Sequence, residues 1–193
     1  MTGKAGWAKT KRVAVSLIAS VALILAGCAG SPPITYYTLS AGGEGSERAP
    51  QADAIILNSV TVPLALDSRE IVLRESDTEV RLLANRWWSA PLSEEINSAL
   101  SQWLAVESID GLAVTSSVTV LAFENRVGGD SAIEALFTLY RAGAEADSLS
   151  CGWQTRSGEA TNLAGSVTAQ QHNLQKLSSA MVAAARSWRC PAE

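Results

Sequence analysis

Histidine is almost absent from this 193-residue sequence, and His172 is the single exception. A hydrolytic triad needs a histidine beside an activated serine, together with an acid that orients the imidazole ring. The sequence contains no Gly-x-Ser-x-Gly motif, and His172 lies at the polar start of an expected helix. We therefore expect no catalytic residue and interpret the chain as a non-enzyme.

Carboxylate pairs and phosphate-binding loops are also lacking. Glu94 and Glu95 are adjacent, but neighbours on a helix point about 100° apart and would not share one site. Acidic residues in a first helical turn complement the helix dipole, which accounts for both. The glycine pairs are not followed by Lys-Ser or Lys-Thr, so a nucleotide-binding loop is not indicated.

Cysteine is scarce as well, with Cys28, Cys151 and Cys190 as the three cysteines of the chain. Two of them cannot build a structural zinc site without further ligands, and we expect no metal. If the chain is exported, Cys151 and Cys190 would form an even pair in an oxidising compartment, which favours a disulfide. The alternative is two separate thiols that never meet.

No apolar run is long enough to span a bilayer as a helix. The uncharged stretch 13–26 has about fourteen residues, short of the roughly twenty that are needed. Four basic residues precede it, and this order is typical of an export signal. The run Leu25-Ala26-Gly27-Cys28 that closes it is similar to the bacterial lipobox. That similarity implies a lipoprotein signal peptide over 1–27 and acylation of the new N-terminal Cys28. The alternative is an ordinary signal peptide with an incidental cysteine.

Positive charge is in short supply once the signal is removed. Four of the fifteen basic residues and none of the nineteen acidic ones lie in the signal, so residues 28–193 carry a formal charge of −8. This argues against nucleic-acid binding and against holding anionic head groups by charge alone. Membrane attachment then depends on the covalent lipid on Cys28, which takes the place of a cofactor, and two or more acyl chains anchor stably. Ala29 after Cys28 favours the outer over the inner membrane, in an envelope location that faces the periplasm.

The remaining chain reads as a tether followed by one domain. Residues 28–53 contain the lipidated cysteine, a Pro/Gly/Ser-rich tether and a strand-forming run at 35–39 that suits a sheet edge. Residues 54–190 predict a single α+β domain, with a mainly antiparallel or mixed sheet of about six to seven strands and two helices packed on it. The expected strands are 54–62, 71–74, 80–83, 113–125, 131–141, 148–156 and 162–168, and the expected helices run from 91, with Pro91 at the first helical position, to about 107 and from 170 to 188.

Trp87 and Trp88 form the most notable pair in the chain. In a strand they point to opposite faces, so one would pack in the core and the other would be available to a partner. We expect an exchange of Trp88 for alanine to weaken partner binding and to leave the fold intact.

Several segments together resemble the ABC-type transport auxiliary lipoproteins, and within them the group similar to paraquat-inducible protein C. The resemblance rests on the lipobox, the Tyr-Tyr-Thr-Leu run at 36–39, the run at 60–63 and, above all, the sequence from Asn85 to Glu94. It implies an accessory or docking component that works with an MCE-domain protein, an inner-membrane permease and an ATPase in intermembrane lipid transport. A homo-oligomer that matches a ring-shaped partner is compatible with this role. By resemblance and aromatic character, the partner-binding candidates are Tyr37, Arg86, Trp87 and Trp88.

Two other functions agree with the same features. A lipid-carrying chaperone lipoprotein would share the fold but enclose an apolar pocket, and a structural envelope lipoprotein would bind the cell wall. The absence of a basic surface leaves nucleic acid out of the set of partners.

Overall fold

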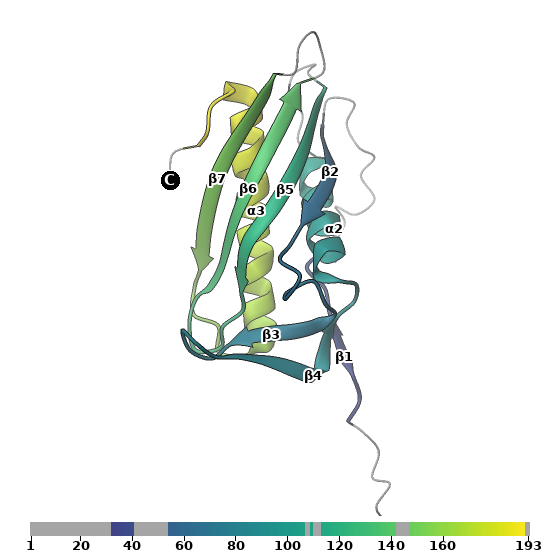
Figure 1. Ribbon diagram of the computed structural model, residues 1–193, viewed down its shortest axis with the longest axis vertical. Helices are drawn as coiled ribbons and strands as arrows, with labels where there is room; N and C mark the ends of the chain where they lie inside the picture. Colours follow the sequence, from purple (N-terminus) through teal and green to yellow (C-terminus); the bar gives the residue numbers. More distant parts are fainter. Residues whose placement is uncertain (1–31, 41–53, 107–108, 110–112, 142–146, 192–193) are drawn as a thin grey trace, which may run out of the picture. The chain divides into compact units, whose positions relative to one another are not determined.

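The computed structural model describes residues 32–40, 54–106, 109, 113–141 and 147–191. The export signal, Cys28 and most of the tether lie outside the described residues. In the described part, seven strands and two helices follow one another (Figure 1). They are β1 (Thr35–Tyr37), β2 (Ile55–Thr61), β3 (Glu70–Arg74), β4 (Val80–Trp88), α2 (Leu92–Leu104), β5 (Val114–Glu124), β6 (Ser131–Arg141), β7 (Ser148–Ser157) and α3 (Leu163–Ser187).

The predicted α+β class is confirmed, and the strands are divided between two sheets. One sheet has four strands in the order β2-β5-β6-β7, and the other has three in the order β1-β4-β3. β2 pairs with β5 in parallel and β1 pairs with β4 in parallel, whereas the other pairs are antiparallel. Both α2 and α3 pack on one face of the four-stranded sheet (Figure 1). The opposite face of that sheet is left uncovered by the described elements.

In strand β5, every second side chain is buried only as far as Val120. Val114, Val118 and Val120 are buried, but the pairing with β6 shifts between Val120 and Ala122. Because a bulge inserts one extra residue and reverses the alternation beyond it, Phe123 points into the core and Ala122 does not. Leu121, which follows the buried Val120, is exposed.

Helix α3 is seven residues longer at its start than the sequence suggested. The run 162–168 was expected to be a last strand, but Asn162 is the N-cap and α3 begins at Leu163. The Asn162 side chain accepts a hydrogen bond from the Gly165 N–H at 2.9 Å, which satisfies one of the free donors of the first turn. This capping interaction outweighs the β-branched residues Val167 and Thr168, whose strand preference is weak by comparison.

Helix α2 begins at Leu92, and Pro91, which was expected to be its first residue, is the N-cap. No side chain at Pro91 caps it, and instead Asp67 from the loop after β2 accepts the Ser93 N–H at 3.1 Å. The helix ends at Leu104, three residues before the expected end near Glu107. No helix among the described residues is both long and apolar enough to cross a membrane.

The end of α3 is held to the far edge of the four-stranded sheet. Cys151 on β7 and Cys190 are joined by a disulfide that closes a loop with a sequence separation of 39. Trp188 ends the helix in the left-handed conformation (φ 51°), which is costly for a residue with a Cβ. Arg141 stacks over the Trp188 ring at 3.8 Å, and the indole donates to Asp147 Oδ1 at 3.1 Å, so these contacts offset the cost.

Removal of the disulfide should lower the free energy of unfolding by about 2–4 kcal/mol, because the bridge restricts the unfolded chain. Cys190→Ala removes the bridge and leaves the buried Cys151 sulfur in place, so urea midpoints of this variant and the parent measure the effect. The parent under reducing conditions is the control and should match the variant. A reduced parent as stable as the oxidised one would contradict the prediction.

Candidate docking surface

The buried carboxylate of Glu95 joins three segments next to the predicted site. Its Oε2 accepts hydrogen bonds from the Thr38 hydroxyl at 2.9 Å and from the Leu39 N–H at 2.8 Å. Its Oε1 accepts from the Ser89 hydroxyl and from the Ala90 N–H at 3.1 Å. The first turn of α2 is therefore tied both to the end of β1 and to the turn after β4. The sequence suggested only a dipole role for Glu95, so this buried role was missed.

The pairing of β1 with β4 decides which candidate side chains share a face. Thr35 lies opposite Arg86, Tyr36 opposite Trp87, and Tyr37 opposite Trp88. Because side chains alternate along a strand, Tyr37, Arg86 and Trp88 belong to one face, and Tyr36 and Trp87 to the other.

On the first face the predicted contact residues hold the fold together. Arg86 donates to the Thr35 hydroxyl at 2.9 Å, and Tyr37 packs against the core. Trp88 is 1% exposed and meets Phe123 edge to face, with ring centroids 6.2 Å apart. The expectation that Trp88 could contact a partner is therefore wrong. Its exchange for alanine would open a cavity, which costs roughly 3–5 kcal/mol.

On the second face, Tyr36 and Trp87 form an accessible aromatic pair. Their rings meet edge to face with centroids 6.3 Å apart, and Tyr36 is 55% exposed. The indole of Trp87 donates to the Ala84 carbonyl at 3.2 Å. Ile34, another exposed apolar residue, precedes Tyr36 by two positions. We call Ile34, Tyr36 and Trp87 the aromatic patch.

An apolar groove lies where the two sheets meet. It has a volume of about 300 Å³ and is lined by the loop after β2 and by residues of β3, β4 and β5. Three exposed apolar side chains line it, namely Val80, Leu82 and Leu121. Contiguous exposed apolar surface of this kind marks interaction sites. We call this feature the inter-sheet groove.

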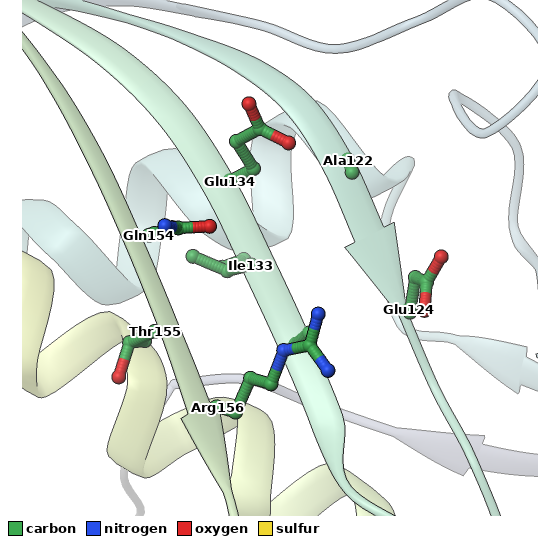
Figure 2. Close-up of a pocket in the computed structure, with 8 residues that line it drawn as sticks. Ala122, Glu124, Ile133, Glu134, Gln154, Thr155 and Arg156 are labelled. Atoms are coloured by element: carbon green, nitrogen blue, oxygen red, sulfur yellow. The ribbon is translucent and has the colours of Figure 1, made fainter.

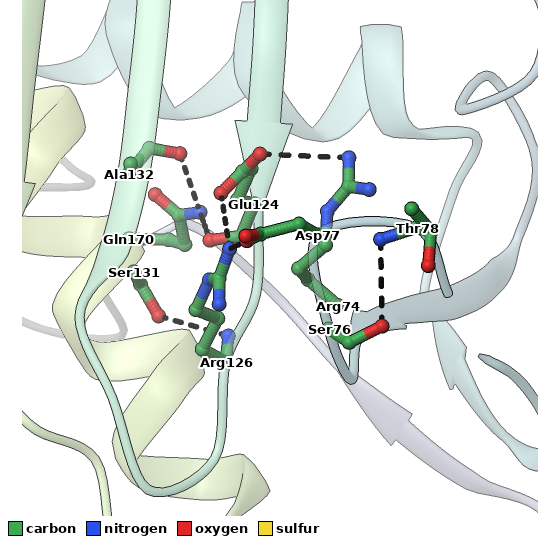
Figure 3. Close-up of polar contacts among 9 residues, drawn as sticks. All are labelled: Arg74, Ser76, Asp77, Thr78, Glu124, Arg126, Ser131, Ala132 and Gln170. Carbon is green, nitrogen blue, oxygen red and sulfur yellow. Dashed lines mark hydrogen bonds and ion pairs between the residues drawn. The ribbon is translucent and has the colours of Figure 1, made fainter. Parts of the chain in front are cut away.

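Polar contacts hold the two sheets at the angle that forms the inter-sheet groove. The Arg74 N–H donates to the Asn125 carbonyl at 2.8 Å, and the Asn125 amide donates to the Val72 carbonyl at 3.2 Å. Arg74 also pairs with Glu124 at 3.5 Å, and Glu124 pairs with Arg126 at 3.5 Å (Figure 3). The buried Oδ1 of Asn125 has no hydrogen-bond partner among the described residues.

The uncovered face of the four-stranded sheet carries a second, more polar hollow. It has a volume of about 420 Å³ and is lined by residues of β5, β6 and β7, among them Glu124, Glu134, Gln154 and Arg156 (Figure 2). Charges of both signs are typical of a solvated surface.

In the part of the chain that the structure describes, no three metal-ligating side chains come together, and His172 is exposed on α3.

The sequence predicted only part of the aromatic patch and did not predict the groove. Trp87 was among the candidates, but Tyr37 was chosen where the structure exposes Tyr36, because the register of two strands fifty residues apart decides which tyrosine faces outward. The groove draws on three separate segments, and its one local signal is the run of apolar residues Pro63–Leu66 at a strand end.

A model of the family described as ABC-type transport auxiliary lipoprotein component matches residues 37–182. A solved structure described only as an uncharacterized protein shares 20% identity with a TM-score of 0.60, covering 79% of this chain and 98% of its own. A Xanthomonas campestris protein of the family DUF330 shares 15% identity with a TM-score of 0.57, covering 79% of this chain and 95% of its own. At these identities, the two structures show a common fold. No curated protein matches the sequence.

Glu95→Ala should destabilise the domain by about 2–4 kcal/mol, because it leaves the buried N–H of Leu39 and the partly buried N–H of Ala90 without an acceptor. Glu94→Ala is the matched control, since Glu94 is an exposed neighbour on the same helical turn and should change stability by less than about 0.5 kcal/mol. Urea unfolding of the two variants measures the difference. Equal midpoints would show that the Glu95 contacts do not stabilise the fold.

Proposed function

The chain belongs to the family of ABC-type transport auxiliary lipoprotein components, and we propose that it is the docking component of an MCE-type intermembrane lipid-transport system. The family accounts for a membrane-anchored lipoprotein of the cell envelope with an auxiliary role in transport. In the proposed system, the domain faces the periplasm, Cys28 is acylated and an MCE-domain protein is the direct partner. The inner-membrane permease and the ATPase act through that partner.

The inter-sheet groove is the observation that carries the docking role. Binding clefts for drug-sized ligands have volumes of roughly 300–1,000 Å³, so a groove of about 300 Å³ fits one or two bulky apolar side chains. It is too small for the two acyl chains of a phospholipid. The size favours protein docking over the alternative of a lipid-carrying chaperone.

The charges around the groove also favour a protein partner over a lipid. Arg74 and Arg126 are both paired with Glu124, and Arg81 is paired with Glu75. A lipid phosphate would have to break one of these pairs to find a cation. An uncharged apolar side chain on an extended segment of a protein partner can enter without that cost.

Leu82→Glu should weaken binding of the MCE-domain partner by about tenfold or more. Burial of a leucine is worth about 1.5–3 kcal/mol, and about 1.4 kcal/mol corresponds to a tenfold change in affinity. Ile56→Glu on β2 is the matched control, because Ile56 and Leu82 are both 60% exposed and Ile56 does not line the groove. Equal losses in both variants, or none in either, would contradict docking in the groove.

The identity of the partner is tested by crosslinking the native lipoprotein in cells and identifying the attached proteins by mass spectrometry. Recovery of an MCE-domain protein supports the proposed function. Recovery of cell-wall fragments alone would favour the structural envelope lipoprotein instead.

Acylation of Cys28 makes a separate prediction. Cells fed a clickable palmitate analogue should label the parent protein, and Cys28→Ser should abolish the label because the acceptor thiol is gone. Density-gradient separation of the membranes should place the labelled parent in the outer membrane, as Ala29 indicates. Equal labelling of the variant would show that Cys28 is not the lipidated residue.

A further inference from the structure

The aromatic patch lies at the free edge of the three-stranded sheet, at the point where the described domain begins. β1 pairs with β4 on one side and has no strand partner on its other side among the described residues. Tyr36 and Trp87 are rigid rings with polar groups that meet edge to face. Ile34, two positions before Tyr36, is exposed as well.

The length of the tether limits how far this edge can lie from the lipid anchor. Seven residue steps separate Cys28 from Thr35, so even a fully extended tether spans about 23–25 Å at about 3.3–3.6 Å per residue. A domain of roughly 160 residues has a radius of gyration of about 15 Å. The edge with β1 is therefore held close to the membrane surface, while the far side of the domain need not approach it.

The chemistry of the patch matches the interfacial region of a bilayer. Tyrosine and tryptophan are enriched at membrane–water interfaces, where an apolar ring body contacts acyl chains and a polar group stays hydrated. The indole N–H of Trp87 already has an acceptor in Ala84, so insertion of the ring leaves no donor unsatisfied. With a formal charge of −8 on residues 28–193, attraction to anionic head groups does not drive this contact.

We propose that Ile34, Tyr36 and Trp87 form a second, non-covalent membrane contact, inserting at the level of the lipid head groups. The contact orients the domain on the membrane that carries the Cys28 anchor. It rests on the acylation of Cys28 and does not depend on the MCE partner. Because Leu82 and Trp87 are five residues apart on β4, the inter-sheet groove lies within about 17 Å of the membrane contact along the strand.

Photocrosslinking of the full-length lipoprotein in cells tests the contact. Tyr36→p-benzoylphenylalanine places a photoreactive group in the patch, and Tyr140→p-benzoylphenylalanine is the matched control. Tyr140 is also an exposed strand tyrosine (42% against 55%), but it lies near the end of β6 away from β3 and β4 (Figure 1). A correct fold is checked in both by the retained Cys151–Cys190 bridge.

We expect a phospholipid adduct at position 36 and its absence at position 140. A protein adduct at position 36, above all with an MCE-domain protein, would overturn the membrane contact and make the patch a partner site, as the sequence suggested for Trp87. A lipid adduct at both positions, or at neither, would also overturn it. None of these outcomes alters the separate test of the groove with Leu82→Glu.

A variant with a longer tether tests whether the aromatic patch has its own affinity for the membrane or is only held near it by the lipid anchor. Insertion of a Gly/Ser segment of twelve residues between Ser31 and Pro32 adds reach without altering the described domain. If the patch has affinity for the interface, the lipid adduct at position 36 persists and is lost on the further change Trp87→Ser. Loss of the adduct on lengthening alone would overturn the proposal.

Discussion

The aromatic patch depends on the hydrogen bonds that the buried carboxylate of Glu95 accepts. A strand of three residues such as β1 has too few ladder hydrogen bonds to be stable alone, and Glu95 holds its end by accepting from Thr38 and Leu39. The same carboxylate accepts from Ser89 and Ala90, which brings the end of β4 to the start of α2. Burial of a carboxylate is costly in itself, and four hydrogen bonds from two separate segments are what make it tolerable.

Once β1 is held in this register, the strand alternation assigns opposite roles to adjacent aromatic residues. Tyr37 and Trp88 turn inward and link the small sheet to the core, where Trp88 packs on Phe123. Tyr36 and Trp87 turn outward and meet each other. The Tyr-Tyr and Trp-Trp dipeptides therefore each supply one core residue and one surface residue, and the surface pair could not exist without the buried pair.

Local patterns in the sequence were sufficient for most elements and insufficient for their arrangement. The strand at 131–141 and the helix after Pro91 were predicted because their apolar spacing is regular. The bulge after Val120 was missed because alternation continues in the sequence while the pairing shifts. The start of α3 was missed because Asn162 reads equally well as a turn residue. The two parallel pairings and the division into two sheets depend on contacts between distant segments, which periodicity does not report. The groove follows from that division, so it was beyond the same reasoning.

The short tether restricts what such a domain can do in transport. If Cys28 is acylated as proposed, about 25 Å of chain and a domain with a radius of gyration of about 15 Å keep every surface of the protein within some tens of ångströms of its membrane. A longer tether would let the domain reach a distant partner, whereas with this one the proposed partner has to approach the membrane. Under that constraint, the orientation of the domain matters more than its reach. A groove that meets a protein partner has to face away from the lipid, and an anchor at one end of a tether limits distance without fixing direction. A second contact at the β1 edge can, because β4 is shared by the aromatic patch and the inter-sheet groove, and its backbone transmits the orientation of one to the other.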